Sequence, residues 1–275
     1  MADTTETAID KAGLTRFEHQ VAGHGGIVHT SDKAVLMKSL NARENLFYKG
    51  AADQPLRAFL PAYHGTARLD NDEAPDAAVA AGDTHICLEN LAADYTSPCI
   101  LDIKMGTQLH DLDATPEKKA RAEAHAKRRT SAEIGYALSG YVIAGHPAKE
   151  RSWLYDLTKQ TVVTEALVPF FDAAQAAVDA EYRDAVVGQI VDWLVEYRDA
   201  VRAAETRMFG SSLLVIVEAD GLRAVARRRD GQRLATVRAI DFAHSHWTPG
   251  QGPDSQYLFG LDNLIRTLQD MLPDK

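Results

Sequence analysis

Hydrophobic residues in the second half of the chain recur at the spacing of an α-helix. Over residues 184–205 this pattern predicts an amphipathic helix that packs one face against a core, with the apolar positions Val186, Val187, Ile190, Leu194, Tyr197 and Val201. The same pattern predicts helices over 164–180 and about 257–271, and a shorter one over 43–49. We expect these helices to be scaffold.

Shorter runs rich in β-branched and aliphatic residues predict strands. In the first third of the chain, 27–30 and 34–40 flank the turn residues Ser31 and Asp32, which indicates a hairpin. Further strands are expected over 84–91, 100–105, 139–144, 212–218, 222–228 and 234–242, the last two joined as a hairpin by Asp230 and Gly231. The acidic, alanine-rich segment 70–83 is expected to be an exposed loop.

The composition fits a globular chain with one large core or two small ones, because 45% of its 275 residues are hydrophobic and 25% are charged. No apolar run approaches the roughly 20 residues that cross a bilayer, and we expect no secretory leader in the acidic start. With only Cys87 and Cys99, we expect reduced thiols and a location in the cytoplasm or nucleus. The formal net charge of −9 opposes nucleic-acid binding, so an anionic ligand needs a local basic patch.

Such a patch is predicted over residues 116–129. Thr115 suits the N-cap, Pro116 suits the first helical position, and alanines favour the helix. The segment carries six positive and two negative side chains, and one helical face collects Lys118, Arg121, His125 and Arg128. A compact polyphosphate suits this face, and a solvated charged helix without a ligand is the alternative.

The segment 98–106 places a carboxylate and an ammonium group side by side. On a strand, residues two apart point the same way, so Asp102 and Lys104 share a face with Ile100. A carboxylate can hold a hydroxyl and an ammonium can hold phosphate oxygens, which suits phosphoryl transfer. The alternative is a structural ion pair that contributes about 1 kcal/mol or less.

Two weaker signals point to nucleotide chemistry. Asp241 ends a predicted strand before small and aromatic residues, a pattern that can hold Mg²⁺ against nucleotide phosphates. Lys38 ends the second hairpin strand and Glu44 begins a helix, so the lysine can reach phosphates while the glutamate orients it. The chain has no P-loop motif and no Cys/His spacing for zinc, and the glycine-rich segment 23–26 does not fit G-x-G-x-x-G.

In their order along the chain, these and other segments resemble the inositol polyphosphate kinase family. Its signature P-x-x-x-D-x-K-x-G is present in full at 98–106. The other matching pieces, spread over residues 20–271, are QVAGH at 20–24, Lys38, Glu44 with FY at 47–48, LP at 60–61 with Tyr63 and Gly65, LENL at 88–91, TS at 130–131 with Gly135, SSLL at 211–214 and IDFAH at 240–244.

The resemblance implies a two-lobed α+β fold like that of protein kinases, with antiparallel sheets. It implies an ATP-binding, β-rich lobe over 1–91 and a second lobe over 92–275 with a small inositol-phosphate-binding insertion at about 107–137. The nucleotide contacts that it implies are Lys38 at the ATP phosphates with Glu44 beside it, the backbone of Glu89 and Leu91 at adenine, Asp102 at ribose, Ser212 near the phosphates, Ile240 in the nucleotide site and Asp241 on Mg²⁺.

At the acceptor, the resemblance places Lys104 beside the accepting hydroxyl and the migrating phosphoryl group. Asp102, Lys104 and Asp241 then form the catalytic set. The implied contacts to the substrate are Lys104, Lys118, Arg121, His125 and Arg128, with His244 at the border of the substrate. His125 stands where many relatives carry a longer basic side chain, so this contact can depend on pH.

The expected activity is ATP- and Mg²⁺-dependent phosphorylation of a soluble inositol polyphosphate by a monomer. Segments 248–254 and 88–91 favour the multikinases, which act on tris- and tetrakisphosphates, whereas 257–265 is more like the hexakisphosphate kinases that make pyrophosphates. A non-catalytic phosphate-binding scaffold is an alternative that needs no metal-binding aspartate. An RNA-binding module on 227–229 is disfavoured, because no aromatic residues lie between these arginines and the chain is acidic.

Overall fold

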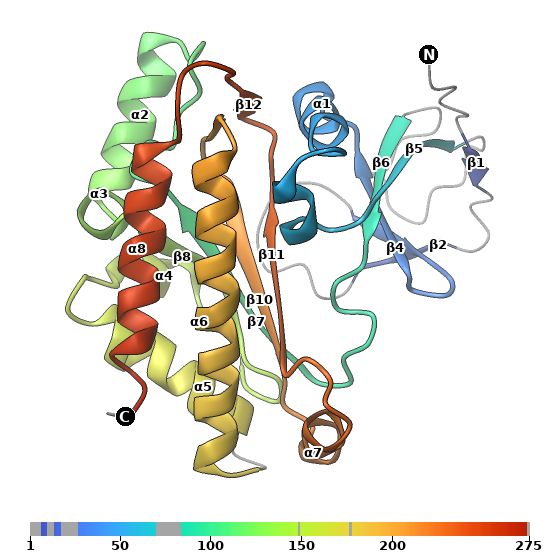
Figure 1. The fold of residues 1–275 in the computed structure, drawn as a ribbon, viewed down its shortest axis with the longest axis vertical. Helices are drawn as coiled ribbons and strands as arrows, with labels where there is room; N and C mark the ends of the chain where they lie inside the picture. Colours follow the sequence, from blue (N-terminus) through green and yellow to red (C-terminus); the bar gives the residue numbers. More distant parts are fainter. Residues whose placement is uncertain are drawn as a thin grey trace.

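The computed structural model describes residues 7–9, 14–17, 27–69, 84–147, 149–175 and 178–273. These residues form two main sheets, with helices packed mainly around the second (Figure 1). The mixture of helices and largely antiparallel sheets confirms the α+β class expected from the sequence. The predicted loop over 70–83 and the segment 20–26 with its matching piece lie outside the described residues.

The first sheet has six strands in the order β1-β5-β6-β4-β3-β2. They span Thr7–Ile9 (β1), Leu14–Arg16 (β2), Val28–Thr30 (β3), Val35–Ser39 (β4), Tyr63–Leu69 (β5) and Thr84–Glu89 (β6). The predicted hairpin is confirmed, because β3 and β4 pair antiparallel across a turn in which Lys33 has a φ of 59°. β4 also pairs with β6, so Lys38 lies on an interior strand of the sheet.

Helix α1 (Ala42–Gly50) follows β4, as predicted, and the 3₁₀ helix η2 (Pro55–Phe59) comes next. The side chain of Asn41 caps α1, because it accepts hydrogen bonds from the first backbone amides of the helix. Stacked rings join α1 to the other half of the chain, with the Phe47 centroid 4.4 Å from Phe242 and 5.1 Å from Trp247. α1 is therefore fixed to the segment that follows the second sheet.

The second sheet has four antiparallel strands in the order β11-β10-β7-β8. They span Pro98–Met105 (β7), Tyr136–Val142 (β8), Ser212–Glu218 (β10) and Ala235–Ile240 (β11); a separate pair is formed by β9 (Thr206–Met208) and β12 (Ser245–Trp247). On β7, Leu101 and Ile103 join the main core, whereas Ile100 joins a smaller cluster. The predicted alternation is confirmed, and Asp102 and Lys104 lie on the face away from the main core, together with Ile100.

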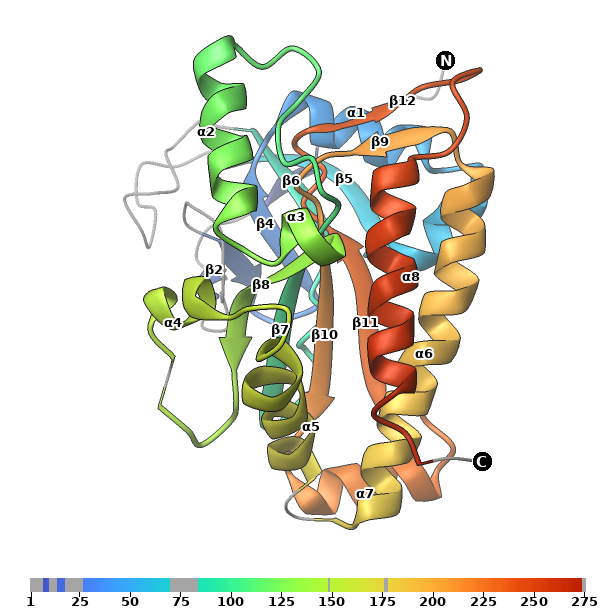
Figure 2. The same ribbon diagram turned by 90° about the vertical axis from the view of Figure 1, so that its left-hand side faces the viewer.

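Helices pack on the core face of the second sheet (Figure 2). They are the π-helix η3 (Val162–Leu167), α5 (Val168–Gln175), α6 (Ala180–Ala203) and α8 (Ser255–Gln269), and the smaller α3 (Ser131–Ile134) and α4 (Arg151–Asp156) contact β8. The apolar face predicted for α6 is buried, and the burial of each large aliphatic side chain stabilises the fold by about 1.5–3 kcal/mol. The helix predicted over 164–180 begins instead as a π-helix at Val162. Among the described residues, no helix combines the length and apolarity that crossing a membrane requires.

One prediction is wrong: residues 222–228 form a helix, α7 (Gly221–Arg229), and not a strand. The side chain of Asp220 caps it by accepting from the amide of Arg223. Leu222 is 87% exposed, so the apolar positions do not mark a buried strand face. Gly231, with a φ of 64°, ends this helix and closes no hairpin with Asp230.

Helix α2 (Pro116–Lys127) matches the prediction for the cationic segment. The Thr115 hydroxyl caps it by accepting from the amide of Lys118, and Pro116 takes the first helical position. α2 buries only Ala126, so packing does not explain its composition. Figures 1 and 2 show α2 at one end of the second sheet.

Candidate active site

The middle of β7 carries the two charged residues of the signature motif. Asp102 is 3% exposed and accepts a 2.5 Å hydrogen bond from the Ser139 hydroxyl. Ser139 reaches it because the register between β7 and β8 shifts here and leaves Ser139 as an extra residue in the ladder. Burial raises the pKa of Asp102, the bond from Ser139 works against this shift, and the nearby Asp241 carboxylate adds to it.

Lys104 is held at its ammonium group. Its Nζ donates a 2.8 Å hydrogen bond to the carbonyl oxygen of Gly210, in the turn between β9 and β10. Ser212, at the start of β10, lies opposite Lys104 and is buried. In the part of the chain that the structure describes, Lys104 and Asp102 are neighbours without an ion pair, so the pair is not the structural salt bridge that was the alternative.

Asp241, directly after β11, belongs to a second charged group. Its φ of 64° is a left-handed conformation that aspartate adopts more readily than most residues. Its carboxylate lies 3.1 Å from the Nζ atom of Lys38, which also pairs with Glu44 at 2.9 Å. Burial acts to lower the pKa of Lys38, but the charges of Asp241 and Glu44 outweigh it and raise that pKa. The ammonium group therefore stays charged between two carboxylates.

Strand pairing brings these two groups to the same end of the second sheet, because Ser212 of β10 lies opposite both Lys104 of β7 and Ile240 of β11, the residue before Asp241. Asp241 lies close enough to raise the pKa of Asp102, so β7 and the end of β11 bring Asp102, Lys104 and Asp241 together. Glu44 braces the arrangement from α1, because its carboxylate accepts a 3.3 Å hydrogen bond from the amide of Phe242. The residues predicted as catalytic thus share one site.

The segment between the two sheets is braced at residues 89–92. The Glu89 carboxylate accepts from the amide of Ala62 at 2.9 Å, so this side chain is anchored to the first sheet. The Asn90 side chain donates to the carbonyl oxygen of Lys33 at 2.7 Å. A connection fixed in this way can present its backbone groups to a ligand without further ordering.

An apolar surface lies beside this connection. Leu91 is buried in the small cluster that contains Ile100, and the half-buried side chains of Leu214 and Ile240 pack against that cluster. Ile240 was predicted in the nucleotide site, whereas Leu214 was not. Its signal was the alternation along 212–218, in which every second residue leaves the main core.

The cations predicted on α2 differ in exposure. Lys118, Arg121 and Arg128 are exposed, whereas His125 is half-buried. The His125 ring meets Tyr155 of α4 edge-on, with 3.3 Å between Nε2 and the tyrosine hydroxyl. The structure therefore places His125 against a neighbouring helix, while the other three side chains remain open to solvent.

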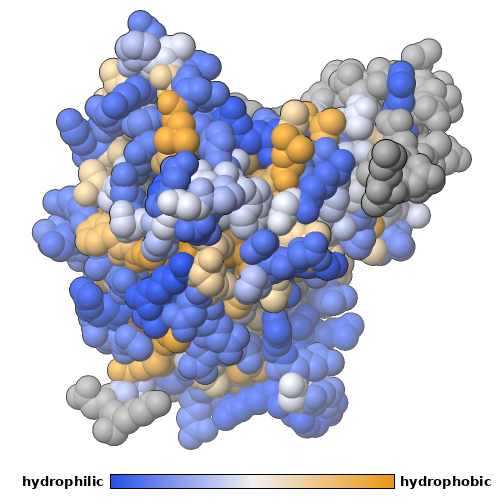
Figure 3. Space-filling model, turned by 45° about the horizontal axis from the view of Figure 1, so that its top comes forward, coloured by the Kyte–Doolittle hydropathy of each residue, from blue (hydrophilic) through white to orange (hydrophobic). Residues whose placement is uncertain are grey.

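His125 reports the electrostatic character of this region. Burial lowers its pKa, and the charges of Arg129, Lys104, Arg151 and Arg128 lower it further. Cations that follow α2, together with one from α4 and one from β7, thus lie near one imidazole. Figure 3 shows the end of the molecule at which α2 lies as mostly hydrophilic, with small separate hydrophobic areas.

Arg129 follows α2 and was not predicted as a site residue. It is 8% exposed, and in the described structure two of its guanidinium nitrogens are buried without a hydrogen-bond partner. The guanidinium carbon lies 5.1 Å from the centre of the Tyr155 ring. Burial lowers the pKa of Arg129, while Tyr155 and Asp102 act in the opposite direction. A buried cation with unused donors is a feature that the sequence does not reveal.

His244 is 59% exposed at its side chain and lies at the same end of the molecule. Its Nδ1 is 3.1 Å from Oδ2 of Asp111, in the loop that leads into α2. The same carboxylate contacts His246 and Arg43. Asp111 was not predicted as a functional residue, because no motif surrounds it.

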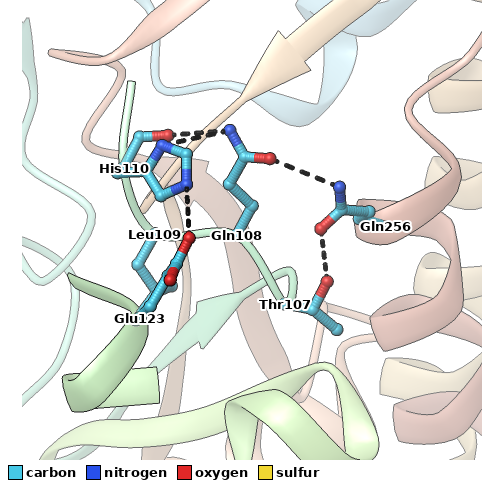
Figure 4. A pocket seen from close by; sticks show the side chains of 6 residues that line it. All are labelled: Thr107, Gln108, Leu109, His110, Glu123 and Gln256. Atoms are coloured by element: carbon cyan, nitrogen blue, oxygen red, sulfur yellow. Dashed lines mark hydrogen bonds and ion pairs between the residues drawn. The ribbon is translucent and has the colours of Figure 1, made fainter. Parts of the chain in front are cut away.

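A small polar pocket of about 180 Å³ lies between the loop after β7, α2 and α8 (Figure 4). Its lining residues are Thr107, Gln108, Leu109, His110, Glu123 and Gln256. Thr107 and Gln108 each hydrogen-bond to Gln256, and His110 lies 3.9 Å from Glu123. These contacts tie the loop to two helices, and no predicted site residue lines the pocket.

Comparison with known protein families identifies the family of this chain. The family model described as inositol polyphosphate kinase matches residues 85–269, well over half of the chain, including β7, α2 and the end of β11. The chain belongs to the inositol polyphosphate kinase family. This confirms the resemblance carried by the signature motif.

Relatives within the inositol polyphosphate kinases differ in how much of their length the chain covers. Human inositol hexakisphosphate kinase 3 is 33% identical over 217 residues, which are 68% of this chain and 51% of the relative. The inositol polyphosphate multikinase of Schizosaccharomyces pombe is 27% identical over 275 residues, with coverage of 95% and 99%. The chain thus spans about half the length of the hexakisphosphate kinases that it matches.

A solved structure supports the fold. The inositol phosphate multikinase of S. cerevisiae, in complex with ADP and Mn²⁺, has a TM-score of 0.75 and 25% identity, and the alignment covers 87% of this chain and 100% of that one. The kinase-like architecture expected from the sequence is therefore confirmed. The lobe boundary at residue 91 and the roles assigned to individual site residues remain predictions.

Proposed function

We propose that this chain transfers the γ-phosphate of ATP to a hydroxyl group of a soluble inositol polyphosphate, with a divalent metal ion and with tris- and tetrakisphosphates as acceptors. Membership of the inositol polyphosphate kinases supports the reaction class. The observation that carries the proposal is that strand pairing brings Asp102 and Lys104 of β7 to the end of β11, where Asp241 contacts Lys38, while the loop after β7 leads into the cationic helix α2. Phosphoryl transfer needs positioning and charge neutralisation, and this site supplies groups for both.

The nucleotide side of the site fits ATP. The apolar surface with Leu214 and Ile240 lies beside the braced segment 89–92, which suits a planar base next to backbone groups. Lys38 supplies a cation for phosphate oxygens. ADP in the related yeast multikinase supports the same class of ligand here.

The residues also fit a hard divalent cation. Mg²⁺ prefers oxygen ligands and is usually held by one or two carboxylates together with substrate phosphates. The carboxylates of Asp241 and Asp102 lie near each other and repel, which a bound cation relieves. When bound, the metal neutralises charge on the transferred phosphoryl group, and Asp241 is the residue proposed to hold it.

The acceptor side suits a crowded polyanion. The Lys104 ammonium group lies at the turn that contains Gly210, and the exposed cations Lys118, Arg121 and Arg128 lie on α2 and at its C-cap. We assign Lys104 to the accepting hydroxyl and the migrating phosphoryl group, and the α2 cations to the substrate phosphates. His244 is assigned to the border of the substrate.

Multikinase activity is favoured over hexakisphosphate kinase activity because the S. pombe multikinase aligns over 99% of its length. The higher identity to human hexakisphosphate kinase 3 supports the second candidate, which forms inositol pyrophosphates. The test is incubation of the purified protein with ATP, Mg²⁺ and each inositol phosphate from tris- to hexakisphosphate, with products separated by anion-exchange chromatography. We expect turnover of tris- and tetrakisphosphates. Turnover of the hexakisphosphate alone, to a pyrophosphate product, would assign the chain to the second candidate.

Two controls sharpen this experiment. Chelation of the metal with EDTA is expected to abolish turnover, because charge on the transferred group is then not neutralised. Binding of inositol phosphates without turnover of any of them would instead favour the non-catalytic scaffold. Location in the cytoplasm or nucleus and the monomeric state remain predictions from the sequence.

A further inference from the structure

Asp111 lies outside every motif of the chain, yet its carboxylate accepts four hydrogen bonds. The side chain is 6% exposed. Oδ1 accepts from Nε2 of His246 at 2.6 Å and from the amide of Leu112 at 2.7 Å. Oδ2 accepts from Arg43 and from Nδ1 of His244 at 3.1 Å. Four donors from three segments of the chain, α1, the loop of Asp111 itself and the segment 244–246, therefore meet on one carboxylate.

The carboxylate stays ionised at neutral pH in spite of its burial. Burial acts to raise its pKa, but the hydrogen bonds from His246, the Leu112 amide and His244 outweigh it and hold the pKa below its usual value. An ionised carboxylate only accepts hydrogen bonds. The ring nitrogens that contact it must therefore carry protons, which fixes the His244 proton on Nδ1.

The two histidines differ in what remains free. His246 is 25% exposed, and its ring also packs against Phe209, so it serves as an anchor. His244 is 59% exposed, and with Nδ1 engaged its Nε2 is the atom left for a ligand. His244 follows Asp241 by three residues, so the turn that carries the proposed metal ligand also carries this imidazole.

Asp111 also links the two sides of the site. Arg43 and Glu44 are neighbours on α1: Glu44 pairs with Lys38, which in turn contacts Asp241, while Arg43 pairs with Asp111. The loop of Asp111 is also attached to α8, because Gln108 of this loop hydrogen-bonds to Gln256 of that helix (Figure 4). Among the described residues Asp111 contacts His244 directly, whereas it has no hydrogen bond or ion pair with Lys38, Glu44 or Asp241, so a change at Asp111 acts first on the acceptor side.

We propose that Asp111 is a positioning residue of the acceptor site: it holds His244 with Nδ1–H bound to the carboxylate and Nε2 presented to a phosphate or hydroxyl group of the inositol polyphosphate. This inference rests on the proposed function. Asp111 itself does not touch the substrate, and it acts by fixing the orientation and tautomer of the imidazole.

The test compares Asp111→Asn with Asp113→Asn. Asp113 lies on the same loop and pairs with the same Arg43, but it is 69% exposed and has no contact with His244 among the described residues. We expect Asp111→Asn to lower kcat/KM for the acceptor roughly 10- to 100-fold while the KM for ATP changes less than about twofold. Asp113→Asn is expected to stay within about twofold of the wild type, and equal behaviour of the two variants would overturn the proposal.

A double-mutant cycle separates positioning from general destabilisation. If Asp111 acts through His244, then His244→Gln and the double variant lose about as much kcat/KM as Asp111→Asn alone. Losses that multiply would show independent roles and contradict the proposal. If the wild type phosphorylates inositol polyphosphates and Asp111→Asn has the same kcat/KM, only this inference is overturned. An inactive wild type would overturn the proposed function.

A spectroscopic measurement tests the same idea without the Asp111 variant. Long-range ¹⁵N–¹H correlation spectra of the wild type at about pH 8, with the His244 signals assigned by their loss in His244→Gln, report which ring nitrogen carries the proton. We expect the Nδ1–H tautomer. An Nε2–H tautomer for His244 would refute the proposal even if Asp111→Asn failed to fold.

Discussion

The nucleotide side and the acceptor side of the site differ in whether their cations have partners within the protein. On the nucleotide side, Lys38 is paired with both Glu44 and Asp241. On the acceptor side, the described structure gives Arg121 and Arg128 no ion pair and leaves two nitrogens of the buried Arg129 without a hydrogen bond. Lys38 is held by internal partners before any ligand arrives. On the acceptor side Asp111 holds His244 in the same way, but Arg121, Arg128 and Arg129 are left for an anionic ligand to neutralise.

This contrast has a physical cost that falls on one side only. A paired charge keeps its geometry at little expense, whereas an unpaired buried cation destabilises the folded protein until a partner binds. We therefore expect substitutions on the nucleotide side to lower the rate of phosphoryl transfer. Substitutions of cations on the acceptor side should lower the affinity for the acceptor and raise the stability of the fold.

The largest effect is expected for Lys104→Ala, at the junction of the two sides. Removal of an ammonium group that meets the migrating phosphoryl group should lower kcat by at least about 100-fold. Initial rates at saturating ATP and acceptor measure this. Lys119→Ala is the matched control, because Lys119 is exposed and its ion pair within the described structure is with Glu123 on α2. Near-normal turnover by Lys104→Ala would remove Lys104 from the catalytic set.

A smaller effect is expected for Arg129→Met, which should weaken acceptor binding but stabilise the fold. The acceptor KM should rise about tenfold, because a charge-assisted contact is lost. The free energy of unfolding should increase by about 1 kcal/mol, because a buried guanidinium with unused donors is replaced by an apolar side chain. Chemical denaturation and steady-state kinetics on the same preparation measure both.

Arg128→Met is the matched control for stability, because Arg128 is exposed and its replacement should leave the free energy of unfolding nearly unchanged. A clear loss of stability in Arg129→Met would mean that the contact with Tyr155 outweighs the cost of burial. The charge of Arg129 would then be stabilised within the folded protein, as that of Lys38 is, and the proposed difference between the two sides would be wrong.

The smallest effect is the pH dependence that His125 imposes on the acceptor side. Its pKa in the free protein lies below 6.5, so a bound phosphate should raise it and binding should take up a proton. The acceptor KM should therefore fall, by roughly two- to threefold more than in His125→Gln, as the pH decreases from about 7.5 to 6. Titration of the acceptor itself cancels in this comparison, and identical profiles would contradict the expectation.

The same shift gives a sign for stability. Because the folded protein binds the His125 proton less readily than the unfolded chain, the His125 contribution destabilises the fold as the pH falls below 6.5. His125→Gln should therefore lose less stability than the wild type between about pH 7 and pH 5. Thermal unfolding across that range provides the measurement.

Local features of the chain account for the elements that were predicted correctly. The cap at Thr115, Pro116 and the alanines specify α2, and alternation along β7 places Leu101 and Ile103 in the core and Asp102 on the other face. The error at α7 has the same origin. The short apolar run with Leu222 and Val225 before Asp230 and Gly231 suggested a strand and a turn, but both side chains are exposed, and the cap at Asp220 favours a helix.

The sequence by itself determined the family, through a signature motif and the order of shorter ones, and it determined which residues are available for chemistry. Only the tertiary structure decided which charges are neutralised. Arg43 and His244 lie 68 and 133 positions from Asp111, and the Ser139 hydroxyl reaches Asp102 through a shift in register. Hydrogen bonds and burial depend on distances in space, and contacts between residues so far apart in the chain leave no local pattern from which they could be predicted.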